Sequence, residues 1–285
     1  AWLQVYELDK SREIIQRNIR FLQSLEALVL IKVETGKANP ADVLQVQLKI
    51  QLLKNELLIL EKQREKPLAD LKRVLNKEEN AAITMTDSLE FSVLMYQKDS
   101  LFSVIQANHP MMKMYELQQE ISKRAIDINA LKNQPTFGVG LDYITVIGRK
   151  DADPTGNGRD IVQLRGMVKI PLYKSQYEAK KQEELLKIQA IELQKENTTD
   201  QFMAIIEKAY VEYETAQLRM KLYGQQIETT RAAIDILTGA YSVDGRKFEE
   251  LLRLEKELID YDLMILKAVV SSHHAKITVE RFITK

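Results

Sequence analysis

The 285-residue chain has no cysteine, only six prolines and ten glycines, and no net charge, since 41 basic residues balance 41 acidic ones. The lack of cysteine excludes disulfides, thiolate metal sites and thiol nucleophiles, but it leaves the compartment open, because periplasmic and cytosolic proteins can both do without disulfides. The balanced charge creates no overall field that would attract nucleic acid or anionic lipid. No apolar run approaches the roughly 20 residues of a membrane-spanning helix. With 45% hydrophobic residues, the composition indicates an ordered, strongly helical protein.

Familiar catalytic patterns are also missing: the sequence has no Ser-His-acid arrangement, phosphate loop or H-E-x-x-H motif. His273 and His274 are adjacent, so on a helix they point about 100° apart and chelate poorly. The Met-rich stretch at 111–114 beside His109 resembles a soft-metal site, but methionine on an amphipathic helix more commonly serves in packing. We therefore expect no enzyme activity, no metal site and no cofactor.

The sequence does contain a helical pattern that is present twice. A series of residues recurs at alternating steps of three and four, the spacing of a coiled-coil seam, and only Thr230 among them is appreciably polar: Ile206, Ala209, Tyr213, Ala216, Met220, Tyr223, Ile227, Thr230, Ile234, Leu237 and Tyr241. After a break the pattern resumes at Leu251, Leu254, Leu258, Tyr261, Ile265 and Ala268. The positions 208 residues earlier are also apolar, namely Val43, Val46, Ile50, Leu53, Leu57 and Leu60. This similarity of pattern predicts a duplicated helical hairpin.

The predicted helices are unusually long. The segment from Gln176 to Tyr241 would form a helix of about 66 residues, near 100 Å at about 1.5 Å per residue, and the return helix would run from Lys247 to about Ile283. The equivalent return helix in the first copy would run from Pro40 to about Asn76. The chain opens in helical register, and part of the second copy has no counterpart before Ala1. We therefore expect a mature or N-terminally truncated piece.

One β segment separates the helices, at 135–173. Its two arms alternate apolar and polar residues and are joined by "GRKDADPTGNGRD", which predicts a hairpin with a polar loop. The candidate outer face consists of Phe137, Val139, Leu141, Val162, Leu164 and Ile170. Alternation alone fits a transmembrane β-barrel or a half-buried soluble hairpin about equally. Pro135 and Pro171 bracket the hairpin next to very long helices, which favours the barrel.

These features together resemble the TolC family of outer-membrane efflux channels. The resemblance rests most on "NHPMMKMYELQQEISKRAIDINALKNQPTFGVGLDY", on "IPLY" after the second strand, and on the turn "AYSVDGRKFEELL". It implies a homotrimer in which each full-length subunit gives four strands to a twelve-stranded barrel and its helices to a periplasmic tunnel. This chain offers one hairpin, so three copies would supply six strands.

The predicted fold is therefore mainly α, with long antiparallel coiled-coil hairpins in two repeats and one inserted transmembrane-type β-hairpin, the TolC-like α-barrel and β-barrel. We expect a first-repeat hairpin at 1–76, a connecting segment at 77–110, an entry helix at 111–134, the β-hairpin at 135–173 and the second long helical hairpin at 174–285.

The resemblance also implies roles for the two helix-to-helix turns, "TGKANPADV" and "SVDGRKFEE". They would be periplasmic tips that contact an adaptor, through Thr35, Gly36, Asn39, Pro40, Ser242, Val243, Asp244, Gly245 and Arg246. Gly36 and Gly245 permit left-handed backbone, and Asn39 can cap the helix that Pro40 starts. The candidate gate residues are Asp42, Glu249, Glu250 and Arg253. The acidic members are as readily explained as ordinary first-turn charges of a helix.

The resulting functional hypothesis is the channel component of a tripartite efflux pump in the outer membrane of a Gram-negative bacterium. It would be a passive conduit for small molecules or ions, with a periplasmic membrane-fusion adaptor and an inner-membrane pump as partners, contact with outer-membrane lipid and none with nucleic acid. The alternative is a soluble coiled-coil scaffold or a periplasmic adaptor. An adaptor would carry lipoyl-like and small barrel modules, and none is recognisable in the sequence.

Overall fold

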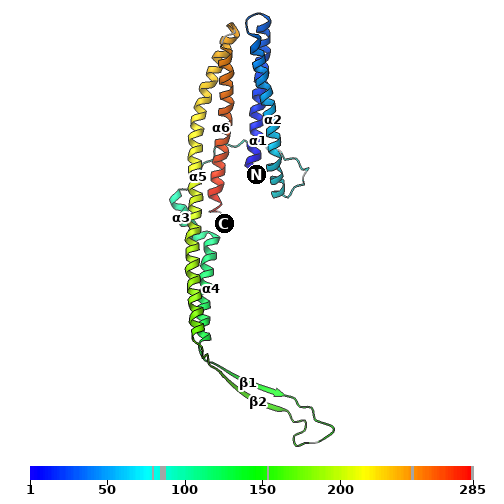
Figure 1. Cartoon of the computed structure of the whole chain (residues 1–285), viewed down its shortest axis with the longest axis vertical. Coiled ribbons are helices and arrows are strands. Elements are labelled where there is room, and N and C mark those ends of the chain that lie inside the picture. The colour runs from blue at the N-terminus through cyan, green and yellow to red at the C-terminus, as the bar shows by residue number, and fades with distance from the viewer. Residues whose placement is uncertain (79, 84–87, 153, 245–246, 284–285) are drawn as a thin grey trace. The chain divides into compact units, whose positions relative to one another are not determined.

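The computed structural model describes residues 1–78, 80–83, 88–152, 154–244 and 247–283, except the side chains of Asp99, Ser242 and Asp244. Its helices and strands, in chain order, are α1 (Trp2–Glu34), α2 (Pro40–Val74), α3 (Lys98–Asn108), α4 (Pro110–Lys132), β1 (Thr136–Ile144), β2 (Ile161–Lys169), α5 (Ser175–Asp244) and α6 (Phe248–Glu280) (Figure 1). The chain forms two compact units, residues 1–103 with 203–284, and residues 104–202. The first is called the four-helix unit below, and the second the hairpin unit.

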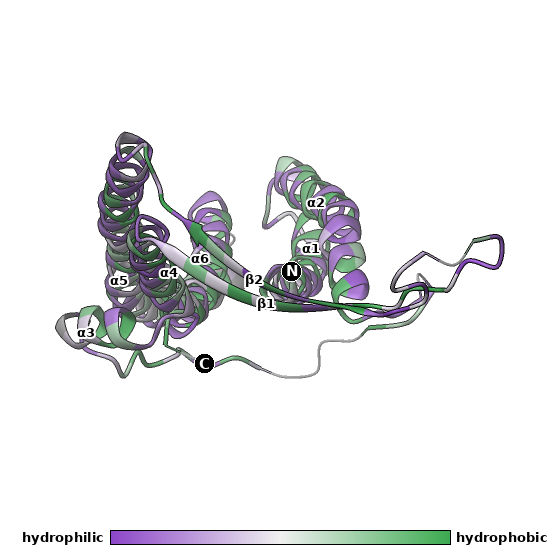
Figure 2. Ribbon diagram, turned by 90° about the horizontal axis from the view of Figure 1, so that it is seen from below, coloured by the Kyte–Doolittle hydropathy of each residue, from purple (hydrophilic) through white to green (hydrophobic). Residues whose placement is uncertain are grey.

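The four-helix unit is built from two antiparallel helical hairpins. Helices α1 and α2 run side by side, and α6 lies along the C-terminal half of α5 (Figure 1). Each helix carries both hydrophobic and hydrophilic residues around its circumference (Figure 2), as expected for amphipathic helices that bury one face. One core joins all four helices, and among its buried members are Val29 of α1, Val46 of α2, Tyr241 of α5 and Leu251 of α6.

The two halves of the predicted repeat occupy matching environments in this core. Val46 is fully buried in it, and Leu254, its counterpart 208 positions later, packs against it. Two further equivalent pairs behave in the same way. In the pair Val43 and Leu251, Leu251 belongs to the core and Val43 packs against it; in the pair Ile50 and Leu258, Ile50 belongs to the core and Leu258 packs against it. Equivalent positions of α2 and α6 therefore face the same interior, as a duplicated hairpin requires.

Helix α5 is the longest element, with 70 residues. It extends three residues beyond the predicted end at Tyr241. The predicted seam is largely buried, because Ile206, Ala209 and Ala216 are each at most 3% exposed, and Thr230, its one polar position, is buried too. A helix this long is stabilised mainly by the packing of its apolar stripe rather than by its own hydrogen bonds.

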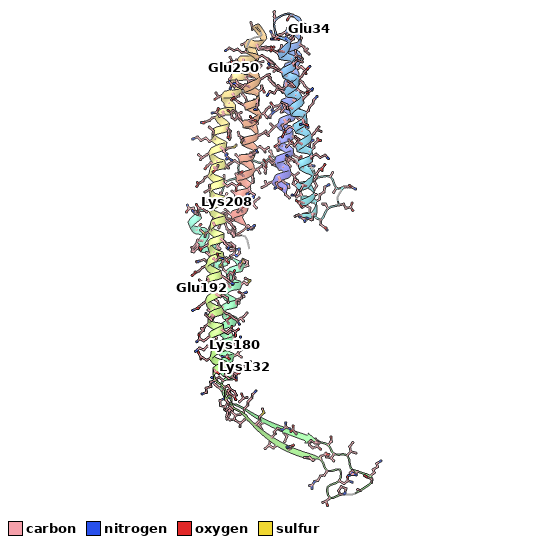
Figure 3. The ribbon with its side chains drawn as sticks, in the orientation of Figure 1. Glu34, Lys132, Lys180, Glu192, Lys208 and Glu250 are labelled. Carbon is pink, nitrogen blue, oxygen red and sulfur yellow. The ribbon has the colours of Figure 1, made fainter. Side chains whose placement is uncertain are left out.

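The hairpin unit combines α4, the N-terminal part of α5 and the two strands. The Tyr115 hydroxyl of α4 and the Thr198 hydroxyl of α5 lie 2.9 Å apart in a buried hydrogen bond. Further along, Gln119 Nε2 donates to Glu192 Oε2 at 2.6 Å (Glu192 is labelled in Figure 3). Helix α4 begins at Pro110, where the His109 ring accepts a hydrogen bond from the Met111 backbone N–H. His109 is thus an N-terminal cap, a role that the sequence analysis did not assign.

The β-hairpin has the predicted antiparallel pairing. Phe137 pairs with Val168, Leu141 with Leu164, and Tyr143 with Val162. Directly opposed residues share a face of the sheet, so Phe137, Val139, Leu141, Val162 and Leu164 lie together on one side. Ile170 continues this alternation one residue beyond the end of β2.

The segment 77–110, expected to be a connecting or equatorial segment, contains the 11-residue helix α3. Helix α2 continues through Pro67, as the expected helix from Pro40 to about Asn76 requires, although proline usually interrupts a helix. Among the described residues, no helix is long and apolar enough to cross a membrane.

Candidate gate at the helical tips

The α1–α2 tip is a compact turn whose backbone groups are capped. Gly36 adopts the left-handed conformation at φ 69°, as predicted, and closes α1 with the two hydrogen bonds of a Schellman motif. They run from Gly36 N to Val33 O at 3.0 Å and from Lys37 N to Lys32 O at 2.8 Å. Asn39 Oδ1 then accepts from Ala41 N at 2.9 Å, which confirms the predicted cap of α2 with Pro40 at its first position.

The α5–α6 tip is reached at the same end of the four-helix unit, where Figure 3 labels Glu34 of α1 and Glu250 of α6. Of the predicted tip residues, Gly245 and Arg246 and the side chains of Ser242 and Asp244 lie outside the described residues. Val243 is 76% exposed. Lys247 adopts left-handed backbone at φ 65° and precedes α6, an uncommon conformation for a residue with a side chain. The Lys247 side chain makes no capping hydrogen bond to the first turn of α6.

Just below the tips, an aromatic pair joins the helices. The Tyr241 ring of α5 is fully buried, and its centroid lies 5.2 Å from that of Phe248 at the start of α6. The Lys32 Nζ of α1, itself in a buried side chain, lies 5.9 Å from the Tyr241 ring centroid. A cation near an aromatic face is attracted to the ring. Tyr241 thus holds α1, α5 and α6 together at one level.

Helix α2 contributes Asp42 to this level. Burial raises the pKa of Asp42 above its ordinary 3.8, and the charge of Glu249 raises it further, while the Asn39 backbone and the Tyr241 hydroxyl lower it. Burial, with Asp42 nearby, raises the pKa of Tyr241 to about 12. The Tyr241 hydroxyl nevertheless completes no hydrogen bond with any described residue. The approach of Tyr241 and Asp42 is therefore a weak contact between the two hairpins.

The other predicted gate residues lie in the first turns of α6. Arg253 Nη1 lies 2.7 Å from Glu257 Oε1, one turn further along α6. Glu250 Oε2 lies 4.0 Å from Lys247 Nζ. Within the chain, Arg253 therefore pairs with the carboxylate one turn towards the C-terminus, an i,i+4 contact along one helix.

A second link between the hairpins lies away from the tips, and the sequence analysis missed it. Arg17 Nη2 of α1 donates to Asp262 Oδ2 of α6 at 2.5 Å, and Arg231 Nη2 of α5 lies 3.6 Å from the other carboxylate oxygen. The Asp262 side chain is only 13% exposed. None of the three residues belongs to the apolar seam, so periodicity alone gave no signal for it.

The β-hairpin separates apolar and polar side chains. On the face that carries Phe137, Val139 and Leu164, each of these side chains is at least 75% exposed. On the opposite face Arg165 Nη2 donates to Asp142 Oδ2 at 2.5 Å. An apolar face that no described residue covers requires another partner, because large exposed apolar patches are unfavourable in water.

No metal-binding arrangement is present in the described part of the chain, in the sense that no three His, Asp or Glu side chains there could share one ion. His273 and His274 instead have separate partners. The His273 Nε2 lies 2.8 Å from the Glu90 carbonyl oxygen, and the His274 Nδ1 lies 3.5 Å from a Glu212 carboxylate oxygen.

Comparison with known proteins gives matches in structure but not in sequence. No protein-family model matches the chain, and no curated protein does. Among solved structures, CusC, studied for the conformational changes that accompany its folding and transmembrane channel formation, superposes with a TM-score of 0.80 at 11% identity, over 99% of this chain and 66% of CusC. The outer membrane protein VceC of Vibrio cholerae gives 0.76 at 13% identity, over 99% and 67%. The open-state outer membrane channel MtrE of Neisseria gonorrhoeae gives 0.75 at 12% identity, over 99% and 64%.

These similarities confirm the predicted fold. The chain has the architecture of the TolC-type outer-membrane efflux channels. It spans about two thirds of the length of the solved structures that it matches.

Proposed function

We propose that the chain is the channel component of a tripartite efflux system, a passive conduit from the periplasm to the exterior across the outer membrane of a Gram-negative bacterium. One observation carries the proposal: 99% of the chain superposes on CusC, and the shared part includes both helical hairpins and the β-hairpin. Small molecules or ions would cross by diffusion, and an inner-membrane pump would supply the energy.

The β-hairpin supports a barrel in lipid. Its apolar face, with Phe137, Val139, Leu141, Val162, Leu164 and Ile170, would face the acyl chains. The opposite face, with the Asp142–Arg165 ion pair, would face a water-filled interior. This alternation is the pattern of transmembrane β-strands. The barrel needs strands from more than one subunit, because one chain contributes only β1 and β2 from its described residues.

Exposed leucines on α2 support assembly into a homotrimer when the protein is full length. Leu44, Leu48 and Leu52 follow each other at steps of four and are each about 60% exposed. Residues four apart share one face of a helix, so these leucines form an apolar stripe that the described chain leaves uncovered. A neighbouring subunit would bury it and so close a tunnel of helices.

The helical tips would serve as both adaptor contact and gate. Thr35, Gly36, Asn39 and Pro40 of the α1–α2 turn would contact the adaptor, and so would Ser242, Val243, Asp244, Gly245 and Arg246 of the segment between α5 and α6. Opening the tunnel would move one hairpin away from the other and would break the contact between Asp42 and Tyr241. Glu249, Glu250 and Arg253 lie on the first turns of α6, where such a movement would change their surroundings.

Cross-linking of the full-length protein in bacterial membranes tests the proposal. A trimer in the outer-membrane fraction, co-purifying with a periplasmic adaptor, is the expected result. A monomer found only in the soluble periplasmic fraction would overturn the channel and favour the scaffold or adaptor alternative.

A further inference from the structure

A cavity of about 570 Å³ lies in the four-helix unit between α1, α2 and α6. Its walls are mainly aliphatic, and the residues of this kind are Leu8, Ile15, Leu22, Leu52, Leu53, Leu60, Leu252, Ile259 and Leu263. This volume and lining are typical of sites that bind small organic molecules. The channel proposal uses one lining residue, Leu52 of the exposed α2 stripe, and assigns no role to the rest of the cavity.

One buried carboxylate lines this cavity. Glu255 of α6 is only 5% exposed, and no hydrogen bond or ion pair joins it to any described residue. Isolated buried carboxylates are rare, because a charge taken out of water needs a partner. Burial, with a smaller effect from Asp235 of α5, raises the pKa of Glu255 to about 7. The cavity therefore contains a carboxyl group whose pKa lies near neutral pH.

The remaining charges around the cavity cancel. They are all partly or fully exposed, and they are Glu7 of α1, Lys49 and Glu56 of α2, and Lys256, Asp260 and Lys267 of α6. Three acids and three bases leave no net charge among these six residues, so the negative charge comes from Glu255 and from its neighbour Asp235 of α5. Asn18 adds a neutral polar group: its amide donates to Ile14 O at 3.1 Å, and its side-chain oxygen stays available as an acceptor.

We propose that this cavity binds a hydrophobic organic cation of the protonated-amine class, with the apolar body against the leucines and the ammonium group paired with Glu255. A neutral apolar molecule would fill the same volume but would leave the carboxyl group without a partner. An organic anion would be repelled. The ammonium N–H groups would donate to the Glu255 carboxylate and to the Asn18 side-chain oxygen.

Proton competition gives the proposal a measurable signature. The cation binds the ionised form of Glu255, so below pH 7 a proton must leave before the ligand can pair. The dissociation constant of the amine should therefore rise about tenfold when the pH is lowered from 8 to 6, because the fraction of ionised Glu255 falls by that factor for a pKa of about 7. The binding of an uncharged ligand should not follow this profile.

The test uses the whole chain and three naphthalene compounds of similar size that differ in charge. They are the cation 2-naphthylmethylamine, the neutral alcohol 2-naphthalenemethanol and the anion of 2-naphthylacetic acid. Isothermal titration at pH 8 should give the tightest binding for the amine, and Glu255→Gln should weaken the amine at least tenfold while leaving the alcohol within twofold. The matched control is Glu228→Gln, an exposed glutamate of α5 that does not line the cavity. Leu53→Trp should fill the cavity and weaken all three compounds.

Three results would overturn the proposal. The first is equal affinity of the unsubstituted chain for the three compounds, and the second is an amine affinity that Glu255→Gln leaves unchanged. The third is the absence of amine binding at pH 8; if Leu53→Trp then also changes the oligomeric state, a second copy of the chain fills the cavity instead. Circular dichroism of each variant checks that the helices are intact, and the channel proposal stands or falls independently of the result.

Discussion

Arg17 of α1 donates to Asp262 of α6 at 2.5 Å, although the two residues lie 245 positions apart in the sequence. Arg231 of α5 approaches the same carboxylate at 3.6 Å. One carboxylate thus links the first helical hairpin to both helices of the second. The two arginine side chains are more than half exposed and so keep much of their hydration. The link restrains the hairpins without burying a lone cation.

The first prediction concerns this link. Asp262→Asn should lower the free energy of unfolding by about 1 kcal/mol, since partly exposed ion pairs are each worth about 0 to 1 kcal/mol and two are lost. Urea denaturation followed by circular dichroism measures the change. Asp260→Asn, on the exposed side of the same helix, should change stability by less than about 0.5 kcal/mol. Equal effects of the two substitutions would show that the link adds nothing.

The second prediction concerns the aromatic contact at the tip. Phe248→Ala removes a ring that is only 4% exposed and should destabilise the four-helix unit by about 3 to 5 kcal/mol. Tyr241→Phe should change stability by less than about 1 kcal/mol, because the Tyr241 hydroxyl completes no hydrogen bond with a described residue. Denaturant unfolding of both variants measures the difference. A loss of several kcal/mol for Tyr241→Phe would mean that the hydroxyl makes a full hydrogen bond to Asp42 in solution.

The third prediction is a dependence of stability on pH through Glu255. The pKa of this group rises from its ordinary 4.5 to about 7 on folding, so the folded state binds the proton more tightly than the unfolded chain. Its contribution to stability is fully present below about pH 4.5 and is lost as the pH rises through 7. The loss between pH 4.5 and pH 8 should be about 3 kcal/mol, at about 1.4 kcal/mol per pKa unit.

The matched measurement compares the unsubstituted chain with Glu255→Gln over that pH range. Glutamine does not titrate, so the difference in unfolding free energy between the two proteins should change steadily between pH 4.5 and pH 8. A constant difference would show that Glu255 keeps its ordinary pKa and is better hydrated than its burial suggests.

The fourth prediction concerns the gate and rests on the proposed function. The resemblance to the TolC family implies acidic residues at the positions of both Glu250 and Arg253, so this chain would reverse the second charge. Arg253→Glu should raise the single-channel conductance of the full-length trimer in planar bilayers. The substitution adds one carboxylate in each of the three subunits, beside Glu250 and Glu257, and this repulsion disfavours the closed tip. The first-hairpin variant Gln45→Glu should have a much smaller effect. Equal conductance changes, or none for Arg253→Glu, would remove Arg253 from the gate.

Glu257→Gln separates the gate from the local ion pair. This variant also breaks the 2.7 Å contact with Arg253 but keeps the arginine. If the positive charge of Arg253 itself controls the gate, Glu257→Gln should change the conductance less than Arg253→Glu does. If the two variants behave alike, the within-helix pair is the important feature.

The fifth prediction places the hairpin. Spin labels at Leu141 and Leu164, paired residues on the apolar face, should be accessible to oxygen in the lipid phase of the intact trimer. A label at Gln163, on the opposite face, should be accessible to a water-soluble relaxation agent. Aqueous accessibility at all three positions would contradict a membrane barrel and would support the soluble hairpin.

The sequence by itself determined the elements and their internal packing. Steps of three and four residues along α5 and α6 placed the buried seam correctly, because burial of a helix follows directly from the periodicity of its apolar residues. Gly36, Asn39 and Pro40 fixed the α1–α2 tip, since left-handed backbone, capping and helix initiation are local preferences of single residues. Alternation with period two likewise set the faces of the β-hairpin.

Only the tertiary structure decided which residues meet from different helices. The contact of Asp42 with Tyr241, the shared carboxylate of Asp262 and the cavity around Glu255 all depend on how one hairpin packs on another. Periodicity gives the buried face of a helix but not the partner that it faces, and a charged residue near that face gives no signal of its own.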